Sequence, residues 1–353
     1  MNRKTLWIAG ASLLAIAAWL GAQQAASNQR KPLAELMPSN ALLYLEAKNF
    51  APLLASWNTS PEKKTWLQSG NYQSFVRTKL ALRLEEVQKA YADGIGVNPN
   101  AVLLENIAGG ESAVAVYDIG KLELLYATRL PTARLADNLL MQARTKFQTR
   151  NAAGQNYYVK STSDGTIAFA VAPGDLLIAG TREDLVAGAL QLIAASNRSS
   201  LRTERWYADA VAKAQNSASP DLRLVVNLER TVRTPHFRSY WIQQNITDLK
   251  QYYASISDLD MSQQGAWTER RVLLRAEPSA SPVDESAVAQ VARLLPADAG
   301  FRQAWAKPSQ AEAEAMLEET ITPRTRAPRT NPEDERAPGA SVVPCGGIRR
   351  ARR

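Results

Sequence analysis

The stretch LLYLEAKNFAPLLASW, residues 42–57, decides how this chain is expected to fold, because it holds one complete structural unit. An apolar run typical of a strand ends at a turn, and a short amphipathic helical pattern follows. Related phrases occur three more times, at residues 124–140 (LLYATRLPTARLADNLL), 176–193 (LLIAGTREDLVAGALQLI) and 224–241 (LVVNLERTVRTPHFRSYW). The uneven spacing of the four units argues against a solenoid or propeller, whose period would be fixed.

Alternating apolar patterns between these units predict β-hairpins. Two β runs meet at the turn Asp118-Ile119-Gly120-Lys121, and two more meet at Pro173-Gly174-Asp175. Further strands are expected at 156–161 and 267–277. We therefore predict an α+β fold in which hairpins and repeated strand-turn-helix units build a largely antiparallel sheet. The helices are expected to pack on one face of this sheet, and a hydrophobic N-terminal helix is expected to precede it.

Helical periodicity predicts four further features. One amphipathic helix is expected over Tyr72–Tyr91, and another is expected to start at Asn98-Pro99, with proline in the first helical position, and to stop at Gly109-Gly110. Thr181 is expected to cap the helix that begins just after it. A long helix in the fourth unit is expected to carry the stripe Ile242, Ile246, Leu249, Tyr253 and Ile256.

The N-terminus has the pattern of an export signal. Arg3 and Lys4 precede the seventeen uncharged residues from Leu6 to Ala22. This segment reaches the lower length limit for spanning a bilayer, and Trp7 and Trp19 lie near its two ends, as interfacial anchors do. We favour an uncleaved membrane anchor, with a cleaved signal peptide as the open alternative. Either interpretation places the rest of the chain outside the cytoplasm.

Charge and composition narrow the function classes. The net charge of +8 divides into +2 from Arg3 and Lys4, +5 from eight arginines and three acids after residue 322, and 8 − 2 − 5 = +1 for everything between. The body therefore carries no basic stripe for nucleic-acid binding. With one Cys, Cys345, and one His, His236, the chain cannot build a Cys/His zinc site, and no calcium-binding loop is evident. No cofactor site is predicted.

Few residues suggest catalysis. His236 has no serine, cysteine or aspartate motif placed to form a triad with it, and packing explains it as well. Seven carboxylates lie at strand ends and turns, where acid–base work is conceivable and solvated turn positions are commoner: Glu46, Glu111, Asp118, Glu123, Asp175, Glu183 and Asp184. We assign no catalytic residue. The aromatics Phe237, Tyr240 and Trp241 are the predicted ligand-binding residues, with core packing as the alternative.

The C-terminal region raises a separate question. RLLPADAGFR (293–302) echoes ELMPSNALLY (35–44), which suggests that a second copy of the domain starts there and is not completed. Residues 323–353 are rich in Arg and Pro, without apolar periodicity. A genuine disordered tail and a frameshifted reading are both open. The predicted organisation is a signal segment (1–27), an α+β domain (28–280), a helical segment (281–322) and the tail (323–353).

Three phrases resemble an exported bacterial family of unknown function, of the DUF3352 type. They are LMPSNALLYLEAKNFAPLLASWNTSPEKKTWL, IAGGESAVAVYDIGKLELLYATRLP and HFRSYWIQQNIT, and the resemblance covers about residues 35–275. It implies a signal-anchored envelope protein and carries over no catalytic residue. We predict a binding or scaffolding protein of the cell envelope, anchored in the inner membrane with its body exported, with an envelope protein as partner. The rival prediction is a hydrolase using carboxylates or His236 in a cleft, and a third is a lipid- or glycan-binding module.

Overall fold

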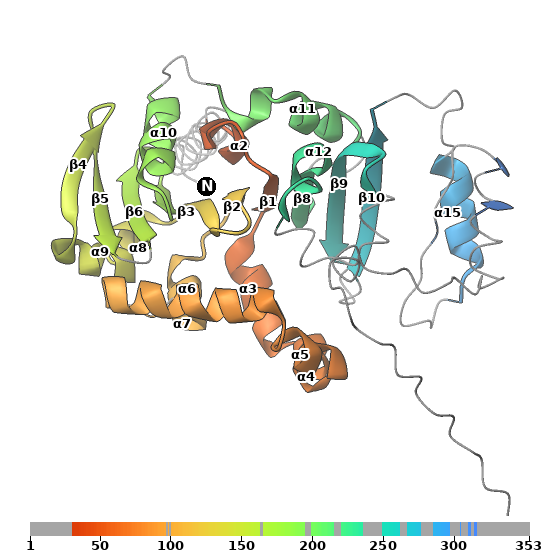
Figure 1. Ribbon diagram of the computed structural model, residues 1–353, viewed down its shortest axis with the longest axis horizontal. Helices are drawn as coiled ribbons and strands as arrows, with labels where there is room; N and C mark the ends of the chain where they lie inside the picture. The colour runs from red at the N-terminus through yellow and green to blue at the C-terminus, as the bar shows by residue number, and fades with distance from the viewer. Residues whose placement is uncertain are drawn as a thin grey trace, which may run out of the picture. The chain divides into compact units, whose positions relative to one another are not determined.

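The structure is a computed structural model of the chain. It describes residues 30–96, 98, 100–162, 165–194, 199–214, 220–235, 249–261, 267–276 and 285–296, and single positions at 304, 310, 311, 314 and 315. The chain divides into two compact units, Met1–Ala276 and Glu277–Arg353. The first contains the sheet (Figure 1), and the second contributes helix α15 (Glu285–Leu294), which lies within the predicted helical segment 281–322.

One antiparallel sheet organises the first unit. Its strands lie in the order β10-β9-β8-β1-β2-β3-β7-β6-β5-β4. Their bounds are β1 Leu43–Ala47, β2 Ser112–Asp118, β3 Glu123–Arg129, β4 Gln148–Ala152, β5 Gln155–Thr162, β6 Gly165–Ala172, β7 Leu176–Gly180, β8 Leu222–Asn227, β9 Tyr252–Met261 and β10 Trp267–Arg275. Strand β1 is central: Tyr44 lies opposite Ala115 on β2 and opposite Val225 on β8.

The predicted strands and units are confirmed. Both hairpins form where the turn residues predicted them, as β2–β3 and β6–β7, and the strands expected at 156–161 and 267–277 are β5 and β10. Each of the four repeated phrases is a strand followed by helix. The helices that follow β1, β3, β7 and β8 are α3 (Phe50–Thr59), α8 (Thr132–Ala136) with α9 (Leu139–Ala143), α10 (Glu183–Ile193) and α12 (Leu228–Thr231).

Helices cover both faces of the sheet, so the prediction that they pack on one face is wrong. One core cluster joins the sheet to α2 (Leu33–Leu36), α10 and α11 (Arg205–Ala212), which lie together in Figure 1. A second cluster, on the other face, joins β6 and β7 to α7 (Ala101–Ile107), α8 and α9. The reason is that β6 is apolar on both sides: Ala168 and Phe169 are adjacent, point to opposite faces, and are both fully buried.

Two helix predictions are also wrong. Residues Tyr252–Met261 form strand β9, although Tyr253 and Ile256 were expected on a helical stripe. Pairing with β8 on one side and β10 on the other satisfies this backbone, and that tertiary context overrides the helical period. The helix expected over Tyr72–Tyr91 is two helices, α5 (Gly70–Phe75) and α6 (Lys79–Ile95), because Thr78 caps the backbone N–H of Ala81 and starts a new helix.

Two predicted helix starts shift by a residue or more. Asn100, rather than Pro99, precedes α7, and its side chain accepts hydrogen bonds from the N–H groups of Val102 and Leu103. Helix α7 ends at Ile107, before the glycine pair, as predicted. At α10 the residue before the helix is Arg182 and no side chain caps it; Thr181 makes contacts elsewhere.

Among the described residues, none of the helices has both the length and the apolar character that a bilayer crossing needs. The predicted anchor, Leu6 to Ala22, and the predicted tail, 323–353, lie outside the described residues.

Candidate functional site

The structure leaves the predicted aromatic site undescribed. Phe237, Tyr240 and Trp241, together with His236, fall in residues 236–248, which lie outside the described residues. Of the segment predicted as a long helix, the structure describes only the residues from 249 onward, and strand β9 begins there at Tyr252. The predicted carboxylates, in contrast, all lie in the described part of the chain, so the candidate site is built from them.

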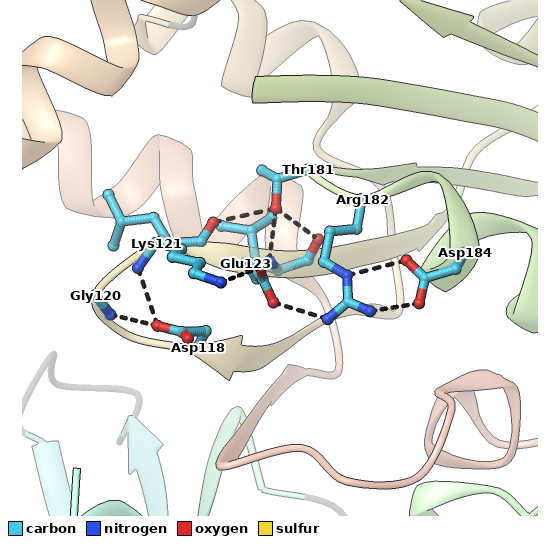
Figure 2. Close-up of polar contacts among 9 residues, drawn as sticks. Asp118, Gly120, Lys121, Glu123, Thr181, Arg182 and Asp184 are labelled. Atoms are coloured by element: carbon cyan, nitrogen blue, oxygen red, sulfur yellow. Dashed lines mark hydrogen bonds and ion pairs between the residues drawn. The ribbon is translucent and has the colours of Figure 1, made fainter. Parts of the chain in front are cut away.

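Asp118 shapes the turn between β2 and β3. One of its carboxylate oxygens accepts hydrogen bonds from the N–H groups of Gly120 (2.7 Å) and Lys121 (2.9 Å), as Figure 2 shows. An aspartate that binds the backbone two and three residues ahead stabilises a tight turn. Asp118 therefore acts within the hairpin.

Glu123 and Asp184 share one arginine. Arg182 donates one hydrogen bond to Glu123 (2.7 Å) and two to Asp184 (2.9 and 2.5 Å), so its guanidinium connects β3 to the start of α10 (Figure 2). Hydrogen bonds to Asp184 are the main cause of the raised pKa of Arg182, which stays positively charged. Both carboxylates are thus engaged in fastening a strand to a helix.

Thr181 supports the same junction instead of capping α10. Its hydroxyl accepts a hydrogen bond from the N–H of Leu124 (2.8 Å) and donates one to the carbonyl of Leu122 (3.1 Å). Leu122 has a φ of 52°, in the left-handed region. Thr181 therefore ties the end of β7 to a strained part of the hairpin.

Glu183 binds across to the outer strands of the sheet. It accepts hydrogen bonds from Arg150 on β4 (2.6 and 2.7 Å) and from the Tyr157 hydroxyl on β5 (2.7 Å). The Tyr157 hydrogen bond is the main cause of the lowered pKa of the Glu183 carboxyl; burial opposes it, and the hydrogen bonds from Arg150 lower the pKa further. Glu183 is therefore ionised at neutral pH and holds α10 on the sheet.

At the end of β3 that lies away from the β2–β3 turn, a buried arginine binds three parts of the chain. Arg129 is 9% exposed and donates to the Glu111 carboxylate (2.7 Å), the Gly174 carbonyl (2.8 Å) and the Lys31 carbonyl (2.6 Å). Nearby, Asp175 pairs with Arg30 at 3.3 Å. Glu111 and Asp175 thus help to hold the N-terminal segment against the turn between β6 and β7.

A row of alternating charges crosses four strands on the face covered by α11. Glu46 on β1 lies opposite Arg223 on β8, which lies opposite Asp258 on β9, which lies opposite Arg270 on β10. Arg223 makes a two-point ion pair with Asp258 (2.7 and 2.9 Å), whose side chain is 2% exposed. Opposite charges on neighbouring strands stabilise the register of the sheet.

Glu46 is the carboxylate with the most unusual environment. The Tyr44 hydroxyl, two residues back on the same face of β1, donates a 3.0 Å hydrogen bond to it. Burial raises the pKa of the Glu46 carboxyl; the Tyr44 hydrogen bond and the nearby Arg223 oppose this, and Glu111 adds to it. Such a group holds its proton more tightly than a solvated glutamate, as general acids do.

Sequence reasoning found the acids but missed their partners. Arg129 and Arg223 each interrupt an apolar strand pattern, LLYATRL and LRLVV, and such an interruption is the signal that a buried cation needs a carboxylate. Within the described residues, no group of three or more His, Cys, Asp or Glu side chains is placed to hold a metal ion.

Comparison with known proteins adds little. No protein-family model matches the chain, and no curated protein matches it. One solved structure, described as crystal form I of TP0453, is similar with a TM-score of 0.38 and 10% sequence identity, over 76% of this chain and 87% of that one. The resemblance to the DUF3352 type stays a prediction.

Proposed function

We propose that this chain is a membrane-anchored, extracytoplasmic binding or scaffolding protein of a bacterial cell envelope, of the DUF3352 type. The proposal is based on the contacts and positions of the seven predicted carboxylates. Each has a structural partner in a turn, a neighbouring strand or a packed helix, and they are spread over both ends of the sheet rather than gathered at one point.

The second support comes from the sequence. The basic pair Arg3 and Lys4 before the uncharged segment from Leu6 to Ala22 is typical of an export anchor. A rigid sheet that is held by buried ion pairs and attached to a membrane is well suited to presenting a surface to an envelope protein. The positive flank would stay in the cytoplasm and the sheet would face the periplasm.

Cysteine accessibility tests the location. In a chain with Cys345→Ser, we would place a single cysteine at Lys121, whose side chain is 74% exposed. A membrane-impermeant maleimide added to intact spheroplasts should label it fully, and alkaline carbonate should leave the protein in the membrane. Labelling only after the membrane is permeabilised would contradict the proposal.

Two matched variants make the result specific. A cysteine at Ala127, which is 1% exposed, should stay unlabelled in both conditions until the protein is denatured. The double substitution Leu13→Arg, Leu14→Arg interrupts the apolar segment and should release the protein from the membrane fraction.

A hydrolase is the second candidate, and Glu46 is the observation that favours it. Its raised pKa and its hydrogen bond from Tyr44 resemble a carboxylic acid prepared to donate a proton. The purified chain would be assayed with p-nitrophenyl esters, phosphates and glycosides. Turnover that falls at least about 100-fold in Glu46→Gln, but not in the matched variant Glu183→Gln, would favour this function over scaffolding.

A further inference from the structure

A helical projection, residues 50–78, has no buried residue. It consists of α3, α4 (Pro61–Gln68) and α5, and it is called the helical arm below. Figure 1 shows α4 and α5 at the end of the projection, beyond α3. Its helices are joined by caps: Ser60 accepts a hydrogen bond from the N–H of Lys63, and Ser69 accepts one from that of Tyr72. The arm is therefore well-formed helix without a core of its own.

Large apolar side chains are exposed along this arm. Those of Trp57, Trp66, Leu67, Phe75 and Val76 are between 36% and 44% exposed. Four more continue the set on the adjoining helices α6 and α7, Leu82, Leu84, Val102 and Leu104, so nine of the fourteen exposed large apolar residues in the described part lie between residues 57 and 104. Apolar side chains gathered in this way mark a surface that contacts something else.

The arm also carries a net positive charge. Lys63, Lys64 and Arg77 against Glu62 give it a net charge of 3 − 1 = +2, whereas the body between Thr5 and Thr322 totals only +1. The rest of that body therefore sums to 1 − 2 = −1. Exposed Trp, Phe and Leu beside Lys and Arg are the residue types with which interfacial helices bind bilayers that contain anionic lipids.

The base of the arm lies at the same end of the sheet as the point where the chain enters the fold. The N–H of Phe50, which begins α3, donates to the Gly110 carbonyl, and the N–H of Gly110 donates to the Arg129 carbonyl. The Arg129 side chain in turn binds the Lys31 carbonyl. Gly110 and Arg129 thus connect the start of the arm, Phe50, to Lys31, where the chain enters the fold.

The predicted anchor ends close to that entry. Eight residues lead from Ala22 to Arg30, and they can span at most about 28 Å. Helix α3 alone is about 15 Å long, so an anchored body brings the arm within reach of the membrane surface.

We propose that the helical arm docks on the membrane surface, with its apolar side chains among the acyl chains and its basic side chains against anionic lipid headgroups. This inference rests on the proposed membrane anchoring, which fixes the distance between body and bilayer. The arm then acts as a second attachment that orients the sheet relative to the membrane.

Depth-dependent quenching tests the docking on the full chain. In a Cys345→Ser background, Leu67→Cys carries an environment-sensitive fluorophore, and the protein is reconstituted into vesicles of phosphatidylglycerol and phosphatidylcholine with nitroxide-labelled lipids. The emission of the label at residue 67 should shift to the blue, and the nitroxide lipids should quench it. The same label on Lys121→Cys, in the β2–β3 turn at the opposite end of the sheet, should be neither shifted nor quenched.

Two double variants separate the apolar and electrostatic contributions. Trp57→Ser with Trp66→Ser, and Lys64→Glu with Arg77→Glu, should each abolish quenching at residue 67. To measure binding by the arm alone, Leu13→Arg and Leu14→Arg disable the anchor in the full chain. Vesicle partitioning of that chain should weaken roughly fivefold for each basic residue removed, and it should weaken as salt rises.

The outcomes distinguish the two proposals. A chain that floats with vesicles and resists carbonate, but shows no quenching at residue 67, would keep the anchor and overturn the docking. Quenching in a chain that carbonate extracts would support the docking and overturn the anchor. A blue shift of the label's emission that occurs without lipid and grows with protein concentration would indicate that the arm binds a second copy of the chain. That result would overturn the docking.

Discussion

Arg129 shows how one buried cation can connect segments that are far apart in the sequence. Its guanidinium binds the Glu111 carboxylate and the carbonyls of Lys31 and Gly174, and its own carbonyl accepts the N–H of Gly110. Removing one partner of a buried ion pair leaves the other charge unpaired in a low dielectric. Arg129 is therefore expected to dominate the stability of this end of the sheet.

Arg129→Ala is expected to lower the free energy of unfolding by about 3–5 kcal/mol. Chemical denaturation followed by circular dichroism measures this. The matched control is Arg205→Ala, since the Arg205 side chain is 81% exposed and its ion pair with Asp209 contributes less than about 1 kcal/mol. Equal losses in the two variants would show that Arg129 does not hold the sheet as the geometry implies.

Two glutamates are expected to affect stability with opposite signs as pH changes. Burial raises the pKa of Glu46 above that of the unfolded chain, so its ionisation opposes folding once the pH rises above the unfolded pKa. Glu46→Gln keeps an acceptor for Tyr44 and removes that penalty. It should raise the melting temperature at pH 8 and leave it unchanged near pH 3. The titratable groups around Glu46 are Tyr207, Glu111, Arg223 and Asp258.

Glu183 gives the opposite profile. Hydrogen bonds from Tyr157 and Arg150 lower its pKa, so its stabilising effect is present above the unfolded pKa and lost as the pH falls through the folded value. Glu183→Gln should therefore lower the melting temperature at pH 8 and have little effect near pH 3. Thermal unfolding of both variants from pH 3 to pH 8 compares the signs, and two curves of the same sign would contradict the assignment.

For single residues, the sequence predicts where the acidic side chains lie but not which groups they bind. Asp118 precedes a Gly-Lys turn, and its local role can be predicted from neighbouring residues. Glu183 binds Arg150 and Tyr157, which are 33 and 26 residues away. Such pairs depend on the order of strands, which the periodicity of one strand does not contain.

Among the elements, the glycine pair before β2 is where a helix end and two strands meet. A Cβ on Gly109 would lie 2.1 Å from the Arg129 carbonyl oxygen and 2.4 Å from the Thr128 hydroxyl. The N–H of Ala51 at the start of α3 donates to the Gly109 carbonyl, so the backbone there is held from both sides. Close approach of the backbone, rather than a turn alone, explains this glycine.

Gly109→Ala is expected to cost roughly 3 kcal/mol or more, because the closest neighbouring atom is the backbone carbonyl oxygen of Arg129, which cannot move aside. Gly110→Ala is the matched control. A Cβ there meets nothing within 4 Å and its φ is not positive, so the cost should stay within about 0.5 kcal/mol. Urea denaturation of both variants decides the point, and similar values for the two would contradict the packing argument.

Prediction of helices and strands succeeds where local turn residues set their limits. It fails where pairing or packing with distant segments sets the structure. Asp118-Ile119-Gly120-Lys121 and Pro173-Gly174-Asp175 carry their turn chemistry themselves, and both hairpins are predicted correctly. Tyr252–Met261 has apolar residues that fit a helical stripe and a strand equally well, and pairing on both edges selects the strand. The second face is likewise covered by helices α7, α8 and α9, whose packing against the sheet depends on the tertiary arrangement.

For the whole molecule, the three described core clusters set the extent of the cooperative fold. All their buried members lie between Leu33 and Leu274, within the unit that ends at Ala276. The edge strands of the sheet, β4 and β10, carry charged side chains such as Arg150 and Glu269, which discourage pairing with another sheet. The first unit is therefore expected to fold without residues 277–353.

A chain that ends after Ala276 should keep the free energy of unfolding and the denaturant slope of the full chain, the former within about 0.5 kcal/mol, because the surface exposed on unfolding the sheet is unchanged. Guanidinium denaturation in one detergent buffer compares the two. The matched control ends after Met261 and lacks β10, whose Leu274 is 8% exposed and belongs to the main core cluster. That shorter chain should lose several kcal/mol or fail to fold, since β9 then becomes an unprotected edge. If the chain ending at Ala276 loses as much as the shorter one, the second unit is part of the same cooperative fold.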